Sequence, residues 1–454
     1  MKKLILLVLA GLNIAVCTAQ KIDGPTMLRI LNEKKASLLV YNNDSLSSYH
    51  KNGVHDLLEL VQNEPARLKG AMVADKIIGK ASASLIVLGG AKEVHTNTIC
   101  TPAKEMLQKA GVKLSFTEEV PYIINRTKTG QCPLDSTLGN VTVPAECLPL
   151  IANFYKPAST VYFTKEITQE SLVRIYKALN VDIPKNARVA VKISTGESQK
   201  TYHLRPDFIA PILAETKGRI VECNTAYGGN RSNTADHRRA IEQRGYVNVD
   251  IMDEEDTIHI PVKDAKWIKY DIVGSHLKNY DFMVNLAHFK GHQMGGFGGV
   301  LKNQSIGVAS SSGKAYIHSA GVTQEVERLW GHVGNQDGFL ESMAAAAQAV
   351  HDHFKKDGRN IVYINVMNNM SIDCDCNGHP ATPMLKDMGI LASTDPVALD
   401  RACLDLVFGH TNTEGDTAGP LIARIKQKHG THTVEYAEQI GLGSQKYKIV
   451  DIDK

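Results

Sequence analysis

Three histidines and three lysines fall within the short stretch 281–318, namely His288, Lys290, His292, Lys302, Lys314 and His318. A lysine supplies a positive charge or, once it is desolvated enough to lose its proton, a nucleophilic amine. A histidine acts as a general acid, a general base or a metal ligand near neutral pH. We predict a catalytic site centred on Lys302, His292 and His318. The alternative is that the histidines are satisfied by backbone carbonyls and do no chemistry.

A glycine-dense turn precedes Lys302 and contains Gly295, Gly296, Gly298 and Gly299. Backbone N–H groups in such a turn can form a nest that favours a carboxylate or a phosphate. The spacing fits neither the dinucleotide fingerprint nor the P-loop, so it does not support NAD or ATP. We predict that these glycines, with Asn303 and Arg231, bind a small anion. The alternative is an ordinary tight turn with a solvated arginine.

A second group of reactive side chains comprises Cys374, Cys376 and His379. Two thiolates and an imidazole can supply three ligands to a soft transition metal such as zinc or iron. The alternatives are free buried thiols or a disulfide from one of these cysteines to Cys223 or Cys403. We expect no easy bridge between Cys374 and Cys376 themselves, because only one residue separates them.

These residues lie in a region where strand-like and helix-like patterns alternate. We expect strands at 188–193, 219–222, 281–286 and 360–366, and helices at 208–217, 234–244, 338–355 and 396–407. Such alternation is typical of a mostly parallel sheet covered by helices. Ligands of these folds collect at the carboxyl ends of the strands, where the 281–318 stretch would lie.

The residues before this region form a smaller α/β pattern, and prolines mark the sequence between the two. Pro144, Pro149 and Pro157 stand among short polar runs and predict a linker over 141–158. We therefore expect a small α/β domain at 24–140 and a larger α/β domain at 159–454. A chain of 454 residues is long enough for two or three domains.

The composition is that of a folded protein, with 43% hydrophobic and 22% charged residues. The formal net charge of +3 is spread along the chain, so no concentrated basic face indicates nucleic-acid binding. Beyond the N-terminal segment, no hydrophobic run approaches the length of a transmembrane helix. The oligomeric state cannot be derived from these features.

The N-terminus, MKKLILLVLAGLNIAVCTAQ, has two lysines, an apolar segment and then small residues. This pattern predicts a bacterial signal peptide at 1–19, cleaved near Ala19. A lipoprotein modified at Cys17 is the less favoured alternative, because Val16 is a poor residue before a lipidated cysteine. We expect a soluble protein that is periplasmic or secreted.

Two motifs in the first domain carry a resemblance to a known family. They are the run from Ala74 to Ala81, and Asn125-Arg126 followed by Cys132-Pro133-Leu134-Asp135. The first domain is similar to domain of unknown function 1893, which implies a fold like that of cytidine deaminases. A zinc deaminase needs a His or Cys beside a catalytic Glu, together with a P-C-x-x-C pair. Neither motif is present, so we expect a binding or regulatory module.

The second domain carries several motifs in order, namely GESQKTYHLRPDF, ECNTAYGGNRSNT, the 281–318 stretch, ILASTDPVALDRACLDLVFG and HTVEYAEQIGLG. Together they resemble domain of unknown function 362 over 159–454. Many members of that family are described as iron-sulfur proteins. The C-x-x-C-x-x-C-x-x-x-C-P cassette behind that description is absent from this sequence.

The same stretch is distantly similar to nickel-dependent lactate racemases. Lys302 lies ten positions after His292, and His318 lies sixteen positions after Lys302, as in those enzymes. The resemblance implies that Lys302 tethers a nickel pincer cofactor, that His318 ligates the metal and that His292 acts as acid or base. Such a cofactor is assembled in the cytoplasm, which conflicts with the predicted export.

These features together predict a metal-dependent or redox site in the second domain, acting on a small anionic metabolite. Zinc, iron and nickel are the metals to consider, and an isomerase or an oxidoreductase is the expected enzyme class. The alternative is a non-catalytic protein that binds an anion or a metal.

Overall fold

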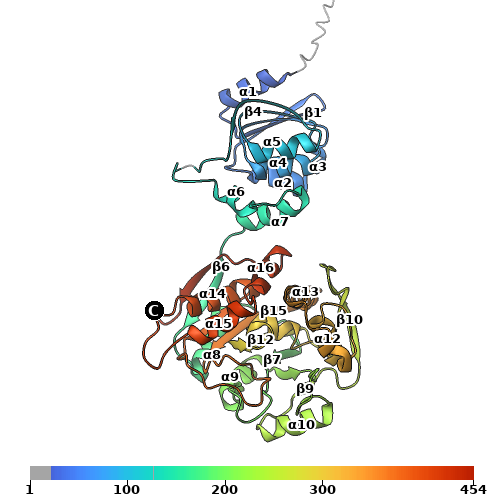
Figure 1. Ribbon diagram of the computed structural model, residues 1–454, viewed down its shortest axis with the longest axis vertical. Helices are drawn as coiled ribbons and strands as arrows, with labels where there is room; N and C mark the ends of the chain where they lie inside the picture. The colour runs from blue at the N-terminus through green and yellow to red at the C-terminus, as the bar shows by residue number, and fades with distance from the viewer. Residues whose placement is uncertain (1–21, 126) are drawn as a thin grey trace, which may run out of the picture. The chain divides into compact units, whose positions relative to one another are not determined.

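The computed structural model describes residues 22–125 and 127–454. The predicted signal peptide and Arg126 lie outside these residues. The chain divides into two compact units, one ending at Tyr155 and the other running from Lys156 to Lys454. Each unit combines helices and strands, so the predicted α/β class is confirmed (Figure 1). Among the described residues, no helix has both the length and the apolar character needed to cross a membrane.

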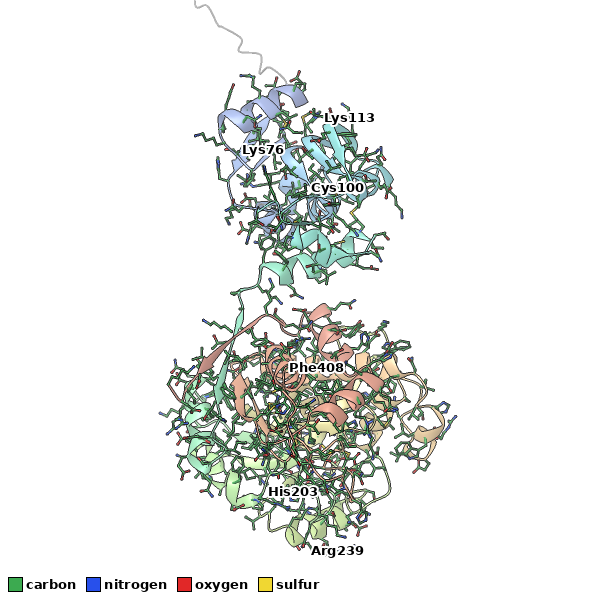
Figure 2. The ribbon with its side chains drawn as sticks, turned by 60° about the vertical axis from the view of Figure 1, so that its left-hand side comes forward. Lys76, Cys100, Lys113, His203, Arg239 and Phe408 are labelled. Carbon is green, nitrogen blue, oxygen red and sulfur yellow. A yellow bond between two sulfur atoms is a disulfide. The ribbon has the colours of Figure 1, made fainter. Side chains whose placement is uncertain are left out.

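The first unit is built on a five-stranded sheet in the order β2-β1-β3-β4-β5. Its strands are β1 (Leu38–Asn42), β2 (Ser45–Tyr49), β3 (Met72–Ile78), β4 (Glu93–Cys100) and β5 (Lys113–Val120). Its helices are α1 (Gly24–Glu33), α2 (His55–Asn63), α3 (Pro65–Leu68), α4 (Lys80–Leu88), α5 (Thr101–Lys109), α6 (Pro133–Leu138) and α7 (Pro144–Tyr155). The β3-β4-β5 pairs are parallel, and β1 pairs antiparallel with both of its neighbours. Cys100, labelled in Figure 2, is buried at the end of β4.

Helix α7 occupies most of the stretch that was predicted to be a linker, 141–158. Pro149 lies inside the helix, and Cys147 and Ile151 are fully buried in the core of the first unit. Burying such apolar side chains outweighs the local preference of proline for a break. The division between the units therefore falls after Tyr155.

The second unit is built on an eight-stranded sheet in the order β17-β6-β16-β15-β12-β7-β8-β9. Its strands are β6 (Ser159–Thr164), β7 (Val189–Lys192), β8 (Arg219–Glu222), β9 (Asp250–Ile251), β12 (Phe282–His288), β15 (Asn360–Met367), β16 (Gly389–Ser393) and β17 (Tyr447–Asp451). Only β16 runs antiparallel to both of its neighbours, and every other pair in this sheet is parallel. The prediction of a mostly parallel sheet is confirmed.

Helices cover both faces of this sheet. They are α8 (Gln169–Ala178), α9 (Pro206–Thr216), α10 (Thr234–Gln243), α11 (Val300–Ser305), α12 (Ser311–His318), α13 (Gln336–Phe354), α14 (Pro396–Phe408), α15 (Gly419–Gln427) and α16 (His432–Gln439). Side chains of α8, α9 and α10 share one core with one face of β12, and side chains of α13 and α14 share another with the opposite face. Strand β12 is buried along its whole length, as expected for a central parallel strand.

Two short antiparallel pairs complete the unit. They are β10 (Thr257–Pro261) with β11 (Tyr270–Gly274), and β13 (Lys290–His292) with β14 (Gly296–Gly298). Asp395 follows strand β16 and directly precedes helix α14. It caps α14 through the N–H groups of Val397 and Ala398. Because β16 is antiparallel, its carboxyl end lies at the opposite edge of the sheet from those of β12 and β15.

Candidate functional site

A cavity of about 360 Å³ lies where β7, β8, β12 and β15 reach their carboxyl ends. The chain segments that follow these four strands build its walls. Predicted site residues that line it are Lys302, His292, His318, Arg231, Asn303 and Cys376. Residues far apart in the sequence meet here because parallel strands end at one edge of a sheet. The cavity size is within the range of small-molecule sites.

The β13-β14 hairpin and helix α11 position His292 and Lys302. His292 pairs with Gly296 across the hairpin, and Gly296 has a φ of +80°, which favours glycine. Helix α11 begins at Val300, directly after the hairpin, and carries Lys302 in its first turn. The glycine-dense turn therefore serves to bring these two side chains into one cavity.

The anion at the N-terminus of α11 is a side chain of the protein itself. The N–H groups of Val300 and Leu301 donate to the Asp400 carboxylate at 2.9 and 3.0 Å. Asp400 is fully buried, and its burial raises its pKa to about 6. A Cβ added at Gly299 would lie 2.2 Å from Asp400 Oδ1, which explains the glycine there.

We predicted that the glycine turn binds an external anion, and the structure shows a different role for it. The cavity lining does not include the four glycines of the turn, Gly295, Gly296, Gly298 and Gly299. The buried carboxylate of Asp400 holds the place in which we expected an external anion. Sequence alone could not pair Asp400 with this turn, because a hundred residues separate it from Val300.

Three lysines line the cavity: Lys192, Lys302 and Lys314. Among the described residues, none of them is within ion-pair distance of a carboxylate. Lys192 Nζ donates to the backbone carbonyl of Ile193, and Lys314 Nζ to that of Ala309, each at 2.5 Å. Carbonyl groups satisfy hydrogen bonds but do not neutralise charge. The positive charges of these three lysines are therefore left for an anionic ligand to neutralise.

Burial weakens the hold of each of these lysines on its proton. It lowers the pKa of Lys192 to about 8 and also lowers that of Lys314. Burial, together with the charges of Lys290 and Arg231, keeps the pKa of Lys302 well below its usual value. Lys302 Nζ lies 3.9 Å from Cys374 Sγ. An unprotonated Lys302 amine is a nucleophile, and a bound anion would restore its charge.

Arg231 lines the cavity, but its guanidinium is already paired. Nε contacts Glu197 at 3.0 Å, Nη1 contacts Glu222 at 3.1 Å, and Nη2 donates to the hydroxyl of Tyr227 at 3.0 Å. We predicted that the Arg231 guanidinium would bind an external anion. Two glutamates of the protein occupy it instead. Its structural role is to balance the charges of Glu197 and Glu222, which also line the cavity.

Asn303 also lines the cavity and holds Lys192 in place. Its side-chain amide donates to the backbone carbonyl of Lys192 at 2.9 Å and to Asn285 Oδ1 at 2.7 Å. Its Oδ1 accepts from Lys192 Nζ at 3.4 Å. Asn303 was predicted as a ligand contact, and its amide N–H groups are instead used within the protein.

His318 presents an unprotonated nitrogen. Its Nδ1 is 2.7 Å from the backbone carbonyl of Lys314, which can only accept, so Nδ1 carries the proton. Burial lowers the pKa of His318 to about 4, so the ring is neutral near pH 7. The ring stacks on Phe339 with centroids 4.7 Å apart. Its Nε2 is therefore available as a base or a metal ligand.

His292 has the opposite tautomer. Its Nδ1 accepts the backbone N–H groups of Gly295 at 2.8 Å and Met294 at 3.3 Å, so in the neutral ring Nε2 carries the proton. Burial, and next the charge of Lys302, holds the pKa of His292 well below its usual value. The cavity thus has one imidazole with an acceptor nitrogen and one with a donor N–H.

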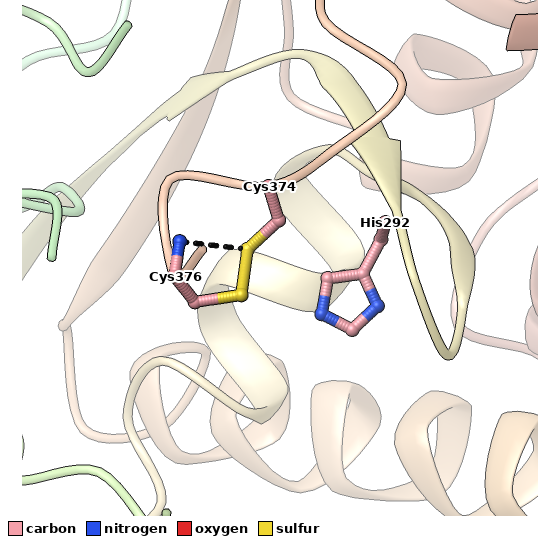
Figure 3. Close-up of side chains that lie close together, drawn as sticks. All are labelled: His292, Cys374 and Cys376. Carbon is pink, nitrogen blue, oxygen red and sulfur yellow. Dashed lines mark hydrogen bonds between the residues drawn. A yellow bond between two sulfur atoms is a disulfide. The ribbon is translucent and has the colours of Figure 1, made fainter. Parts of the chain in front are cut away.

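Cys374 and Cys376 form a disulfide with each other (Figure 3). The expectation that the pair could not bridge easily is wrong, because the loop brings their Cα atoms to 5.1 Å, within the span of a disulfide. Cys223 and Cys403, the partners considered from the sequence, are free and buried.

The predicted metal ligand set changes in one member. His379 is exposed, whereas His292 lies close to the two cysteines. Ligand atoms of His292, Cys374 and Cys376 all lie within 4.8 Å of one another. Disulfide sulfurs are not thiolates, so this group fits a soft metal ion only after reduction. The backbone bonds to His292 Nδ1 also oppose metal binding at Nε2, because Nε2 would have to lose its proton.

Two cavity residues were missed by the sequence analysis as site residues: Lys192 and Lys314. Lys192 ends the apolar run of β7, and a lysine at the carboxyl end of a buried parallel strand was a usable signal. Lys314 was noted in the 281–318 stretch but was given no role. It lies on α12, one turn before His318.

The first unit contains a cavity of its own, of about 660 Å³. Asp75, Cys132 and Asp135 are among its lining residues. Asp75 and Lys76, from the first of the two motifs quoted for this domain, lie on strand β3. Burial raises the pKa of Asp75 to about 7. Among the described residues of this unit, no group of histidines, cysteines and carboxylates has metal-site spacing.

Comparison with known families identifies both units. Residues 26–155 match the sequence model of a family described as a domain of unknown function (DUF1893), and residues 189–405 match that of another (DUF362). The chain joins these two domains of unknown function. The resemblances inferred from the motifs are confirmed. No curated protein matches the chain.

Two solved structures resemble parts of the chain. A DUF1893 family protein from Thermotoga maritima is 25% identical, with a TM-score of 0.27, covering 29% of this chain and 88% of its own. The lactate racemase apoprotein from Thermoanaerobacterium thermosaccharolyticum is 16% identical, with a TM-score of 0.30, covering 54% of this chain and 56% of its own. The chain thus spans little more than half of that enzyme.

Proposed function

We propose that the DUF362 domain binds a small anionic metabolite in the lysine-lined cavity and transfers a proton on it. The supporting observation is the convergence of Lys192, Lys302 and Lys314 without an ion-paired carboxylate. A buried cluster of unpaired amines is costly until an anion neutralises it. The bound anion would raise the pKa of each amine and so take up protons from solution.

The two histidines provide the proton transfer. His318 offers an acceptor nitrogen, and His292 offers a donor N–H in the same cavity. His318 Nε2 can remove a proton from one atom of the ligand and return it to another, while the His292 N–H donates a hydrogen bond to the charge that develops on the ligand. This arrangement supports an isomerase more directly than a hydrolase.

Calorimetric titration with phosphate and with small mono- and dicarboxylates tests this proposal. We expect at least one of these anions to bind, with affinity that falls as the pH rises from 6 to 9, because binding needs protonated lysines. Lys302→Met should weaken binding at least about tenfold, on the order of 1.4 kcal/mol. Lys448→Met, an exposed lysine on β17, is the matched control. No binding of any anion, or equal effects of the two variants, would refute the proposal.

A soft metal ion is the second candidate, favoured by the proximity of His292, Cys374 and Cys376. The fit requires the reduced dithiol. Elemental analysis of protein purified with and without a reductant decides this. Zinc, iron or nickel near one equivalent in the reduced sample alone would support a metal role, and less than about a tenth of an equivalent in both would exclude it.

The cofactor implied by the lactate racemase resemblance would use Lys302 as a covalent tether and His318 as a ligand. Lys302 and His318 line one cavity and offer a nucleophilic amine and an unprotonated Nε2, so they fit these two roles. Such a group would supply a nickel centre. Intact mass of the mature protein shows whether Lys302 carries an adduct, and the same spectrum tests the proposed export, since cleavage after Ala19 leaves Gln20 as the first residue.

A further inference from the structure

The Cys374–Cys376 disulfide presents two unequal sulfurs to its surroundings. Cys376 lines the lysine-lined cavity, whereas Cys374 is 3% exposed and does not. The loop that carries both follows β15, so the disulfide forms part of the cavity wall. Figure 3 shows the bridge facing the ring of His292. Of the two bridged cysteines, Cys376 is therefore the one that borders a ligand in the cavity.

We propose that this disulfide is a thiol–disulfide exchange centre for small anionic thiols bound in the cavity. The proposal rests on the anion binding proposed above and names the class of ligand. The lysines attract the carboxylate of the thiol, and its sulfur reacts with Cys376. The protein acts as the oxidant, and the thiols are oxidised to their disulfide.

The exchange proceeds in two steps that conserve atoms and electrons. The ligand thiolate attacks Cys376 Sγ, a ligand–Cys376 bond forms, the Cys374–Cys376 bond breaks, and the electron pair leaves on Cys374 Sγ. A second ligand thiolate then attacks the ligand sulfur of this mixed disulfide and releases Cys376 as a thiolate. Two ligand thiols become one ligand disulfide, and the cysteines receive their two protons and two electrons.

The surroundings of Cys374 suit a leaving thiolate. The backbone N–H of Cys376 donates to Cys374 Sγ at 3.1 Å, and Lys302 Nζ lies 3.9 Å away. A backbone donor and a nearby amine both stabilise a thiolate. In the neutral ring, His292 Nε2 carries a proton and lies on the side of the disulfide, where it can donate a hydrogen bond to the released thiolate, which takes its proton from solvent.

The first test compares thiols of different charge. Mercaptoacetate, 2-mercaptoethanol and cysteamine are given at equal thiolate concentrations to the full-length protein, and the loss of the disulfide is followed by intact mass after alkylation. We expect mercaptoacetate to react at least about tenfold faster than cysteamine, and Lys302→Met to remove this preference while Lys448→Met keeps it. Equal rates for the three thiols, or a preference for cysteamine, would overturn the proposal.

The second test separates the two sulfurs. With dithiodiglycolate, an anionic disulfide, Cys374→Ser should accumulate a mixed disulfide at Cys376, because no resolving thiol remains. Cys376→Ser should react at least about tenfold more slowly through the buried Cys374. Similar reactivity of both variants, with circular dichroism matching the parent, would contradict the assigned attack on Cys376.

Acetate and glycolate, which lack the thiol, distinguish failure of this proposal from failure of the proposed function. Both are titrated into the parent protein by calorimetry. If they bind and mercaptoacetate leaves the disulfide intact, the exchange chemistry is wrong and anion binding stands. If they do not bind and no thiol reacts, both proposals are wrong.

Discussion

At the scale of single residues, burial decides what the reactive groups can do. The spacing of His292, Lys302 and His318 predicted that they form one site, and the three line one cavity. Their protonation depends on contacts that spacing does not contain, such as the backbone carbonyl of Lys314 at His318. Burial lowers the pKa of both histidines and of Lys302, so it disfavours the charged form of each of these groups.

Asp271 on β11 is a buried carboxyl group outside the cavity lining. It is 0% exposed, and neither carboxylate oxygen has a hydrogen-bond partner among the described residues. Its burial raises its pKa to about 8. The folded protein therefore holds a proton that the unfolded chain releases above a pKa of about 4, so Asp271 makes stability fall as the pH rises from about 4 to 8.

Replacing Asp271 with asparagine removes this titration. We expect Asp271→Asn to be more stable than the parent by about 1 to 4 kcal/mol at pH 8, and to lose that advantage near pH 4. Urea unfolding at both pH values measures the difference. Asp182→Asn, at an exposed position, should change stability by less than about 0.5 kcal/mol at either pH. A difference between Asp271→Asn and the parent that does not vary with pH would contradict the prediction.

At the scale of elements, apolar patterns located four strands of the eight-stranded sheet, β7, β8, β12 and β15, but not the reversed direction of β16. The central strands β12 and β15 were predicted within one or two residues, because strands buried on both faces are nearly continuous apolar runs. The antiparallel direction of β16 depends on its pairing with β15 and β6, which no local pattern encodes. Helix α7 was missed because prolines locally indicate a break.

The junction between β14 and α11 gives a prediction at this scale. Gly299→Ala would place a Cβ 2.2 Å from Asp400 Oδ1 and displace the carboxylate from the N–H groups of Val300 and Leu301. We expect a loss of about 1 to 3 kcal/mol in the free energy of unfolding. Gly334→Ala is the control, because nothing lies within 4 Å of its added Cβ. Equal stabilities of the two variants in urea unfolding would count against this contact.

At the scale of the whole molecule, each unit has a hydrophobic core of its own. Buried side chains before Tyr155 form one set of clusters, and those of 156–454 form others. All residues of the lysine-lined cavity come from the second unit. The proposed chemistry therefore needs no residue of the DUF1893 domain in the lining of the cavity.

This independence predicts that a fragment of residues 156–454 folds alone. We expect it to bind the same anions as the full chain, with affinity within about twofold, because its core and cavity are complete. Calorimetric titration and thermal unfolding of the fragment and of the full chain measure this. An unfolded fragment, or one that binds anions more than about tenfold more weakly, would show that the first unit contributes to the site.

The sequence by itself determined the α/β class, and it selected Lys302, His292 and His318, which line one cavity. These follow from local periodicity and from spacing along one segment, whereas the two-family organisation follows from the resemblance of the motifs to known families. The tertiary structure decided that Asp400 accepts the N–H groups after the glycine turn and that Glu197 and Glu222 pair with Arg231. It also decided that Lys192 lines the cavity. Each of these contacts joins segments that only the sheet and its connecting loops bring together, so no local pattern could encode them.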